Sequence, residues 1–512
     1  MTRLLLVYAL LTGTIGFLLR PDEYSGNGET PTHWRGLASN MIKQKARLQL
    51  NVGVAKNVIM FIGDGMGIST VTAGRILKGQ LAGQTGEEEY LSFENFPYTG
   101  LSKTYSQDSQ VTDSASASTS YFCGVKANIG TLGLDGRSTR GQCSTQHNYE
   151  ISSILDWSIA AGKSVGFVTT ARVTHATPAG LYANIAERHW EGDIYTRNQT
   201  GGCKDIAAQL VDDYKQMQVI LGGGREFFQR FDQMDPERGD NSRYGRRDGR
   251  DLIQEWKTGQ HGLNRNSAYV WNETAFNQID PTTTDSVLGL FEQSHMQYDY
   301  DRFDPRYEKA GEPSIANMTE LAIKILSKNP NGYFLMVEGA KIDHGHHEGR
   351  AKLALYDVLA FEKAVDTADR ITSETDTLTI VTADHGHTLS ISGYPSRGNG
   401  IFDKVDTSLA QDGKPYTTLL YANGQGYRVH NGSRPDITNV DTTIDQYQQE
   451  AAVPLAQETH SGEDVAIYAR GPMSHLLTGV HEDSNIAGVM AYASCVGAYS
   501  NYADCAASLT SG

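Results

Sequence analysis

Three apolar runs in the sequence each end in acidic or histidine residues. They are NVIMFIGDGMG at 57–67, GYFLMVEG at 332–339 and DTLTIVTADHGH at 376–387. Continuous apolar runs of this length are typical of strands buried on both faces, as in a parallel sheet. Residues 351–371 place apolar side chains at helical spacing between two of these runs. The alternation predicts an α/β fold with a doubly wound, largely parallel central sheet flanked by helices.

The acidic residues at the ends of these runs are candidate ligands. Asp64, Glu338 and Asp384 each follow or end a predicted strand, and ligands collect at the carboxyl ends of strands in such sheets. GDGMG at 63–67 has an alternative interpretation as a degenerate dinucleotide-binding turn. Its spacing is GxGxG rather than GxGxxG, and Asp64 would then lie beside a pyrophosphate.

The decapeptide KIDHGHHEGR at 341–350 contains three histidines and two acids. Imidazole and carboxylate are common zinc ligands, so this stretch indicates a metal site. If a helix begins just after the strand, Asp343 and His347 share one face of it and can bind the same ion. His344 and His346 cannot both join that face, and His346 has the weakest claim to a role.

The stretch VTDSASASTS at 111–120 is rich in hydroxyl side chains. It is either a loop or a helix that begins at Asp113-Ser114, whose N-terminal N–H groups would favour an anion. A metal ion could then hold Ser114 as the nucleophile, since no histidine is near it in sequence. Arg188 is either a fork for two phosphoryl oxygens or an ordinary salt-bridge residue.

The composition indicates an exported globular protein. A net charge of -16 over 512 residues argues against nucleic acid as the main partner. The apolar run from Leu4 to Leu19 predicts a signal peptide, with an uncleaved anchor as the alternative.

Five cysteines without a CxxC pair predict two disulfides, Cys143–Cys203 and Cys495–Cys505, and a free Cys123. Glycosylation sequons begin at Asn198, Asn272, Asn317 and Asn431.

Together these stretches resemble the animal alkaline phosphatases. The matching motifs are NVIMFIGDGMG, QVTDSASAS, CGVKAN, VTTARVTHATPAG, VILGGGR, FLMVEGAKIDHGHHEGRA, VTADHGH and ETHSGEDVA, in order from about residue 50 to residue 495. The resemblance implies a hydrolase of broad specificity that acts on small phosphomonoesters and releases inorganic phosphate. It further implies a phosphoserine intermediate, two zinc ions, one magnesium ion and a homodimer.

The resemblance also implies roles for individual residues. Ser114 matches the nucleophile and Arg188 the residue that clamps the phosphate. The implied metal ligands are Asp343, His347 and His460 for the first zinc; Asp64, Asp384 and His385 for the second zinc; and Asp64, Thr177 and Glu338 for magnesium. His175 and His344 would lie near the magnesium without binding it, and His387 would orient Asp343. An implied calcium site has the ligands Glu237, Phe291, Glu292 and Glu312, with Asp304 as an alternative to Glu312.

The expected boundaries follow the same resemblance. They are a signal peptide at 1–20, an N-terminal arm helix at 30–50, a catalytic domain at 51–495 and a tail at 496–512. The catalytic domain would carry a calcium lobe at about 232–312 and an exposed crown at 393–458. The tail carries no hydrophobic signal for a lipid anchor. We expect a secreted protein without a transmembrane span in the mature chain, or a cell-surface protein if an anchor tail is missing from this sequence.

Two other functions remain as alternatives. A phosphodiesterase or sulfatase of the same superfamily would share the metal site, but a threonine or modified cysteine would be expected where this chain has Ser114. A binding protein that has lost catalysis is the other alternative. Every ligand position is filled in this chain, which disfavours it.

Overall fold

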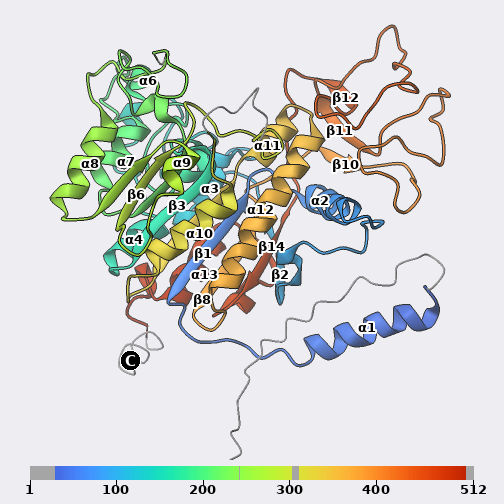
Figure 1. Ribbon diagram of the computed structural model, residues 1–512, viewed down its shortest axis with the longest axis horizontal. Helices are drawn as coiled ribbons and strands as arrows, with labels where there is room; N and C mark the ends of the chain where they lie inside the picture. The colour runs from blue at the N-terminus through green and yellow to red at the C-terminus, as the bar shows by residue number, and fades with distance from the viewer. Residues whose placement is uncertain (1–28, 242, 303–310, 503–512) are drawn as a thin grey trace, which may run out of the picture. The chain divides into compact units, whose positions relative to one another are not determined.

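The computed structural model describes residues 29–241, 243–302 and 311–502 (Figure 1). The described residues before Leu50 and those from Leu50 onward form two compact units. In the first unit, helix α1 (Pro31–Lys45) begins after Thr30, whose hydroxyl accepts a hydrogen bond from the His33 N–H. None of the residues of α1 is buried. The expected signal peptide, Asp304 and Cys505 lie outside the described residues.

A ten-stranded sheet forms the centre of the second unit, in the order β15-β2-β14-β8-β1-β7-β3-β4-β6-β5. Neighbouring strands are parallel except at β14, which runs opposite to both β2 and β8. The strands of this sheet are β1 (Asn57–Gly63), β2 (Tyr98–Lys103), β3 (Ser164–Arg172), β4 (Val219–Gly223), β5 (Ser267–Val270), β6 (Ser286–Leu290), β7 (Tyr333–Gly339), β8 (Thr377–Thr382), β14 (Val465–Arg470) and β15 (Gly479–Glu482). The predicted α/β fold with a largely parallel sheet is confirmed.

Two hydrophobic clusters lie on opposite faces of the sheet, because successive residues of a strand point to opposite sides. Along β1, Met60 and Ile62 belong to one cluster, and Ile59 and Phe61 to the other. Helices α3, α4, α7 and α13 contribute to the first cluster, and α2, α10 and α12 to the second. Figure 1 shows α10 and α12 in front of the sheet.

The helices of this unit are α2 (Ile68–Leu81), α3 (Ser114–Cys123), α4 (Ile154–Ala160), α5 (Ala176–Ala179), α6 (Asp193–Thr196), α7 (Ile206–Asp213), α8 (Leu252–Gly262), α9 (Glu273–Phe276), α10 (Ile315–Leu326), α11 (Lys341–His347), α12 (Ala351–Ile371) and α13 (Asn485–Ser494). Five 3₁₀ turns are described, η1 (Ser92–Asn95), η2 (Cys143–Thr145), η3 (Arg225–Phe227), η4 (Ser474–Leu477) and η5 (Gly497–Tyr499). None of the described helices is long and apolar enough to span a membrane.

Two small sheets lie outside the central one. Strands β10 (Leu389–Ile391), β11 (Leu419–Gly424) and β12 (Ala451–Pro454) form a three-stranded sheet, to which the expected crown segment contributes β11 and β12. Strands β9 (Gly386–His387) and β13 (His460–Ser461) form a short antiparallel pair in which His387 lies opposite His460. The segment between β9 and β13, which contains the expected crown, therefore begins and ends at neighbouring positions.

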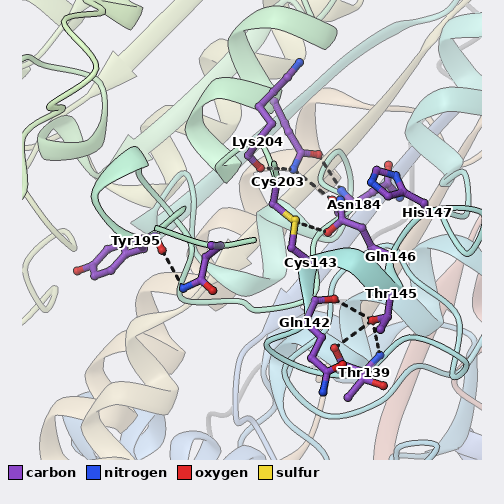
Figure 2. Close-up of a disulfide and its surroundings, with 12 residues drawn as sticks. Thr139, Gln142, Cys143, Thr145, Gln146, His147, Asn184, Tyr195, Cys203 and Lys204 are labelled. Atoms are coloured by element: carbon purple, nitrogen blue, oxygen red, sulfur yellow. Dashed lines mark hydrogen bonds between the residues drawn. A yellow bond between two sulfur atoms is a disulfide. The ribbon is translucent and has the colours of Figure 1, made fainter. Parts of the chain in front are cut away.

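A disulfide joins Cys143 and Cys203, and Figure 2 shows its surroundings. Gln146 lies beside it, with Oε1 2.9 Å from the Cys203 sulfur. Cys123 is a buried free thiol in α3. Cys495 is disulfide-bonded. Its pairing with Cys505 stays a prediction, since Cys505 is not described.

Candidate metal centre

Three buried carboxylates lie at the carboxyl ends of neighbouring strands. Asp64 follows β1, Asp384 follows β8, and Glu338 is the next-to-last residue of β7. Because β1 lies between β7 and β8, these strand ends adjoin. The exposed fractions of Asp64, Glu338 and Asp384 are 0%, 0% and 2%. Within the described ranges no lysine or arginine forms an ion pair with any of them, so their charges lack compensation from protein cations.

The electrostatics of this cluster favour a bound cation. Burial raises the pKa of Asp64 well above its ordinary value, and the negative charges of Asp384, Asp343 and Glu338 raise it further. Burial also raises the pKa of Glu338 to about 7. Both oxygens of Asp64, Oδ2 of Asp384 and Oε1 of Glu338 are buried without a hydrogen-bond partner. Since buried polar atoms normally have partners, these atoms fit the ligand set of a metal ion.

Asp343, His347 and His460 form a first ligand group. Helix α11 places Asp343 and His347 one turn apart, with Asp343 Oδ1 3.4 Å from Nε2 of His347 and 3.4 Å from Nε2 of His460. Each imidazole donates its Nδ1–H to a backbone carbonyl, His347 to Glu458 at 2.6 Å and His460 to Thr112 at 2.9 Å. The neutral form of each ring then has a lone pair on Nε2, and the two Nε2 atoms face each other 3.0 Å apart, where two lone pairs repel. A cation such as zinc relieves that repulsion.

Asp64, Asp384 and His385 form a second ligand group. His385 Nε2 lies 3.2 Å from Asp384 Oδ2 and 3.6 Å from Asp64 Oδ1. The three ligand atoms that these residues offer lie within 4.8 Å of one another. The His385 ring stacks on the His460 ring with 3.5 Å between centroids, so the two ligand groups adjoin.

Asp64, Glu338 and His175 form a third group of potential ligands, and Thr177 is the further ligand expected from the sequence. Asp64 and Glu338 lie within 4.8 Å of each other and of a ring nitrogen of His175. Thr177 lies in the short helix α5, and its hydroxyl is buried without a hydrogen-bond partner. Two carboxylates and a hydroxyl are oxygen ligands, which magnesium prefers.

Ser114 is the first residue of helix α3, so the hydroxyl-rich stretch forms a helix and not a loop. Asp113 caps this helix by accepting a hydrogen bond from the Ser116 N–H at 3.0 Å. Ser114 is 2% exposed, and its Oγ lies 3.3 Å from His385 Nε2. The candidate nucleophile is thus adjacent to the second ligand group and at the positive end of a helix.

Arg188 lies in a turn and pairs with the residue before the candidate nucleophile. It donates to Asp113 Oδ2 at 2.9 Å, and its side chain is 14% exposed. Burial raises the pKa of Asp113, but the Arg188 charge and the N–H groups of Ser116 and Gly130 outweigh it and lower that pKa. The salt bridge therefore holds the guanidinium against Asp113, the residue that precedes Ser114. The two interpretations of Arg188 from the sequence, phosphate clamp and salt-bridge residue, are compatible.

His387 lies between two carboxylates, one of which the sequence analysis missed. Its Nε2 is 2.7 Å from Asp343 Oδ1 and its Nδ1 is 2.5 Å from Glu458 Oε2. Burial lowers the pKa of His387, but the Glu458 charge and the hydrogen bonds to Asp343 and Glu458 raise it to about 10. Glu458 is two residues before His460 and far in sequence from His387, so only the fold reveals the contact.

His295 is a further residue that the sequence did not single out. Its ring lies 4.3 Å from that of His344 and 5.1 Å from that of His175, between centroids. Three imidazoles this close resemble a metal site, but both His295 nitrogens face donors of Arg172. The Arg172 backbone N–H is 3.3 Å from Nδ1 and its guanidinium is 2.5 Å from Nε2. His295 therefore has no free lone pair for a metal in this arrangement.

His346 is fully buried and not solvated. Its Nε2 lies 3.0 Å from the Thr70 hydroxyl and its Nδ1 2.7 Å from the Tyr421 hydroxyl. Burial lowers the pKa of His346 well below its ordinary value. The neutral ring connects α11 to α2 and β11, which fixes the helix that carries Asp343 and His347.

The residues expected to bind calcium are only partly brought together. Glu292 and Glu312 both accept hydrogen bonds from Gln297. Glu237 instead pairs with Arg225 at 2.8 Å. Phe291 is buried in the core. In the described part of the chain, no group of three ligating side chains within 4.8 Å includes Glu237, Glu292 or Glu312.

Comparisons with known proteins identify the family of this chain. Residues 55–496 match the family model described as alkaline phosphatase. The chain is 47% identical over 511 residues to the tissue-nonspecific isozyme of alkaline phosphatase from Rattus norvegicus, covering 99% of this chain and 96% of that protein. It is 46% identical over 472 residues to an alkaline phosphatase from Gadus morhua, covering 91% of this chain and 98% of that protein.

Solved structures show the same fold. The alkaline phosphatase of Thermus thermophilus superposes with a TM-score of 0.62 at 22% identity, covering 87% of this chain and 92% of that one. The enzyme from the Antarctic bacterium TAB5 superposes with a TM-score of 0.60 at 22% identity, covering 88% and 100%.

Proposed function

Because this chain belongs to the alkaline phosphatase family and is a phosphomonoester hydrolase, we propose that it acts on a broad range of phosphomonoesters through a phosphoserine on Ser114. The observation that carries this proposal is the position of the Ser114 hydroxyl. It is buried at the N-terminus of α3 and lies 3.3 Å from His385 Nε2, beside ligand groups with unsatisfied buried atoms.

The ligand groups fit three ions. Asp343, His347 and His460 would hold the first zinc; Asp64, Asp384 and His385 the second zinc; and Asp64, Thr177 and Glu338 magnesium. When bound, such ions supply positive charge that favours the ionised serine and neutralises phosphoryl oxygens. A calcium ion at Glu237, Phe291, Glu292 and Glu312 is a further proposal, supported by the shared contact of Glu292 and Glu312 with Gln297.

The residues of the chain divide the reaction between them. Ser114 Oγ forms a bond to phosphorus as the bond between phosphorus and the ester oxygen breaks; the serine proton goes to water, and the ester oxygen takes a proton from water and leaves as the alcohol. The oxygen of a second water then forms a bond to phosphorus as the bond to Ser114 Oγ breaks, one of its protons returns to Ser114, and inorganic phosphate is released. Arg188, fixed by Asp113, donates to two phosphoryl oxygens throughout. Because these contacts are all with the phosphoryl group, the alcohol can vary, and broad specificity follows.

Hydrolysis of p-nitrophenyl phosphate at alkaline pH, measured with metal content and with and without a chelator, tests the proposal. Two zinc ions per chain and chelator-sensitive hydrolysis are expected. Ser114→Ala should keep the metals and lose both turnover and the phosphoserine detected by mass spectrometry. Metals without monoester hydrolysis would favour the phosphodiesterase or sulfatase, and a folded protein with neither metals nor activity would favour the binding protein.

We also propose a secreted or cell-surface homodimer. Helix α1 leaves Trp34, Met41 and Ile42 with exposed fractions of 51%, 46% and 67%. An isolated helix gains most of its stability by packing an apolar face, so these side chains are suited to a partner subunit. Light scattering should give a dimer mass for the full chain and weaker association for a chain that begins at Leu50. A monomeric full chain at micromolar concentration would contradict the proposal.

A further inference from the structure

We propose that Glu458 is the positioning residue of the first zinc site: it fixes Asp343 through His387 and fixes His347 through its own backbone. This inference rests on the proposed function, because it concerns the ligands of that site. Glu458 lies in the segment between β12 and β13, two residues before His460, and is 1% exposed.

The side chain of Glu458 fixes the orientation in which the His387 ring contacts Asp343. Its Oε2 contacts His387 Nδ1 at 2.5 Å, and its Oε1 accepts from the Thr388 N–H at 2.8 Å and hydroxyl at 2.6 Å. These contacts hold the His387 ring in one orientation, in which its Nε2 lies 2.7 Å from Asp343 Oδ1. This contact fixes the orientation of the Asp343 carboxylate and thus the lone pairs that remain for a metal.

The backbone of Glu458 fixes a second ligand. Its carbonyl accepts from His347 Nδ1 at 2.6 Å, and its N–H donates to the His347 carbonyl at 3.1 Å. The first contact selects the tautomer of His347 whose Nε2 is free to bind a cation. The backbone hydrogen bond from the Glu458 N–H links the C-terminal end of α11 to the segment between β12 and β13. His460 follows in β13, opposite His387. Glu458 therefore contacts one ligand of the first group directly and a second through His387, and it lies two residues before the third, His460.

None of these contacts reaches the second ligand group. Asp384 accepts from the Gly65 N–H at 3.0 Å and from its neighbouring His385 N–H at 2.9 Å. Glu458 therefore acts on one site and not on the other, a selectivity that general loss of stability would not produce. Partners that orient metal ligands typically change metal affinity by about 10- to 100-fold when they are replaced.

Glu458→Gln tests this inference in two backgrounds that each keep one zinc site. His385→Ala leaves the first site, and there E458Q should raise the zinc dissociation constant by about 10- to 100-fold. His347→Ala leaves the second site, and there E458Q should change the constant by less than about twofold. Zinc affinity is measured on metal-stripped protein by competition with a colorimetric chelator, with circular dichroism as the check on folding.

Glu94→Gln is the matched control. Glu94 accepts from the Arg75 guanidinium at 3.1 Å and from the Leu91 N–H at 2.8 Å, away from the metal ligands. The Glu94→Gln variant removes the same carboxylate charge as Glu458→Gln and should leave zinc affinity unchanged in both backgrounds. If E458Q lowers only the melting temperature and leaves zinc affinity intact in both backgrounds, Glu458 is merely structural and the inference is overturned. If the wild-type chain binds no zinc, the proposed function fails as well, so the two failures are distinguishable.

Discussion

Replacement of Arg188 measures how much of the catalysis comes from the phosphate clamp. One guanidinium nitrogen donates to Asp113 at 2.9 Å and a second lies 3.3 Å from His175 Nε2. Each of these nitrogens keeps a further N–H, which leaves donors for two phosphoryl oxygens. Hydrogen bonds to charged groups contribute ~1.5–3 kcal/mol each. Loss of two in Arg188→Ala therefore costs about 3–6 kcal/mol, or roughly 10²- to 10⁴-fold in kcat/KM. Arg188→Lys keeps the charge but not the fork, and we expect a fall of about 10- to 100-fold.

The assay is the initial rate of p-nitrophenyl phosphate hydrolysis at saturating zinc and magnesium, with inorganic phosphate as a competitive inhibitor. The inhibition constant of phosphate should rise in parallel, because free phosphate presents the same oxygens to Arg188. Asp113→Asn is the control: its one carbonyl oxygen still caps α3, but its amide nitrogen cannot accept from Arg188, so the guanidinium is kept and its salt bridge is lost. It should lose less activity than Arg188→Ala; an equal loss would mean that Arg188 acts through its salt bridge with Asp113 and not on the phosphate. The reasoning is refuted if Arg188→Ala keeps kcat/KM within about threefold and phosphate inhibition is unchanged.

Three further predictions concern the metals, pH and the disulfide. His385→Ala should lose one zinc and the activity together, because His385 belongs to the second ligand group and contacts Ser114; unchanged zinc content by mass spectrometry would contradict that assignment. In metal-free protein the pKa of Glu338 is raised from 4.5 to about 7, so native Glu338 keeps a proton that the unfolded chain releases, and stability falls as pH rises between these values. The melting temperature of Glu338→Gln minus that of wild type should thus grow from about pH 4.5 to about pH 7, and a pH-independent difference would count against this. Replacing Cys143 and Cys203 by alanine opens a cross-link between residues 60 apart and should cost about 4 kcal/mol, measured as a lower melting temperature; an unchanged melting temperature would be inconsistent with that entropy estimate.

The sequence predicts best those residues whose position follows from one local element. Asp64, Glu338 and Asp384 follow from the rule that parallel strands end at one edge of the sheet, and β8, β1 and β7 are indeed neighbours. Asp343 and His347 follow from helical spacing, and α11 begins directly after β7. These predictions need only the period of a helix or the direction of a strand.

Residues that act through distant contacts were beyond such reasoning. Glu458 meets His387 across 71 positions, and His295 meets Arg172 across 123. Neither lies in a periodic pattern, and no spacing rule relates a loop carboxylate to a histidine on another segment. The salt bridge between Asp113 and Arg188, 75 positions apart, had the same difficulty. Only the packing of the sheets and helices determines which of these side chains meet.

The short pair of strands β9 and β13 has a consequence for how this protein can change over time. It closes the crown segment where that segment leaves and rejoins the ligand-bearing chain, with His387 opposite His460. The entropy of closing a loop grows only slowly with its length. Insertions or deletions in the outer loops between these two strands should therefore leave the distances among the ligands almost unchanged, provided that Tyr421 still contacts His346 and that the returning segment still ends in Glu458. The chain thus combines an outer lobe open to evolutionary or engineered remodelling with a centre that tolerates almost none.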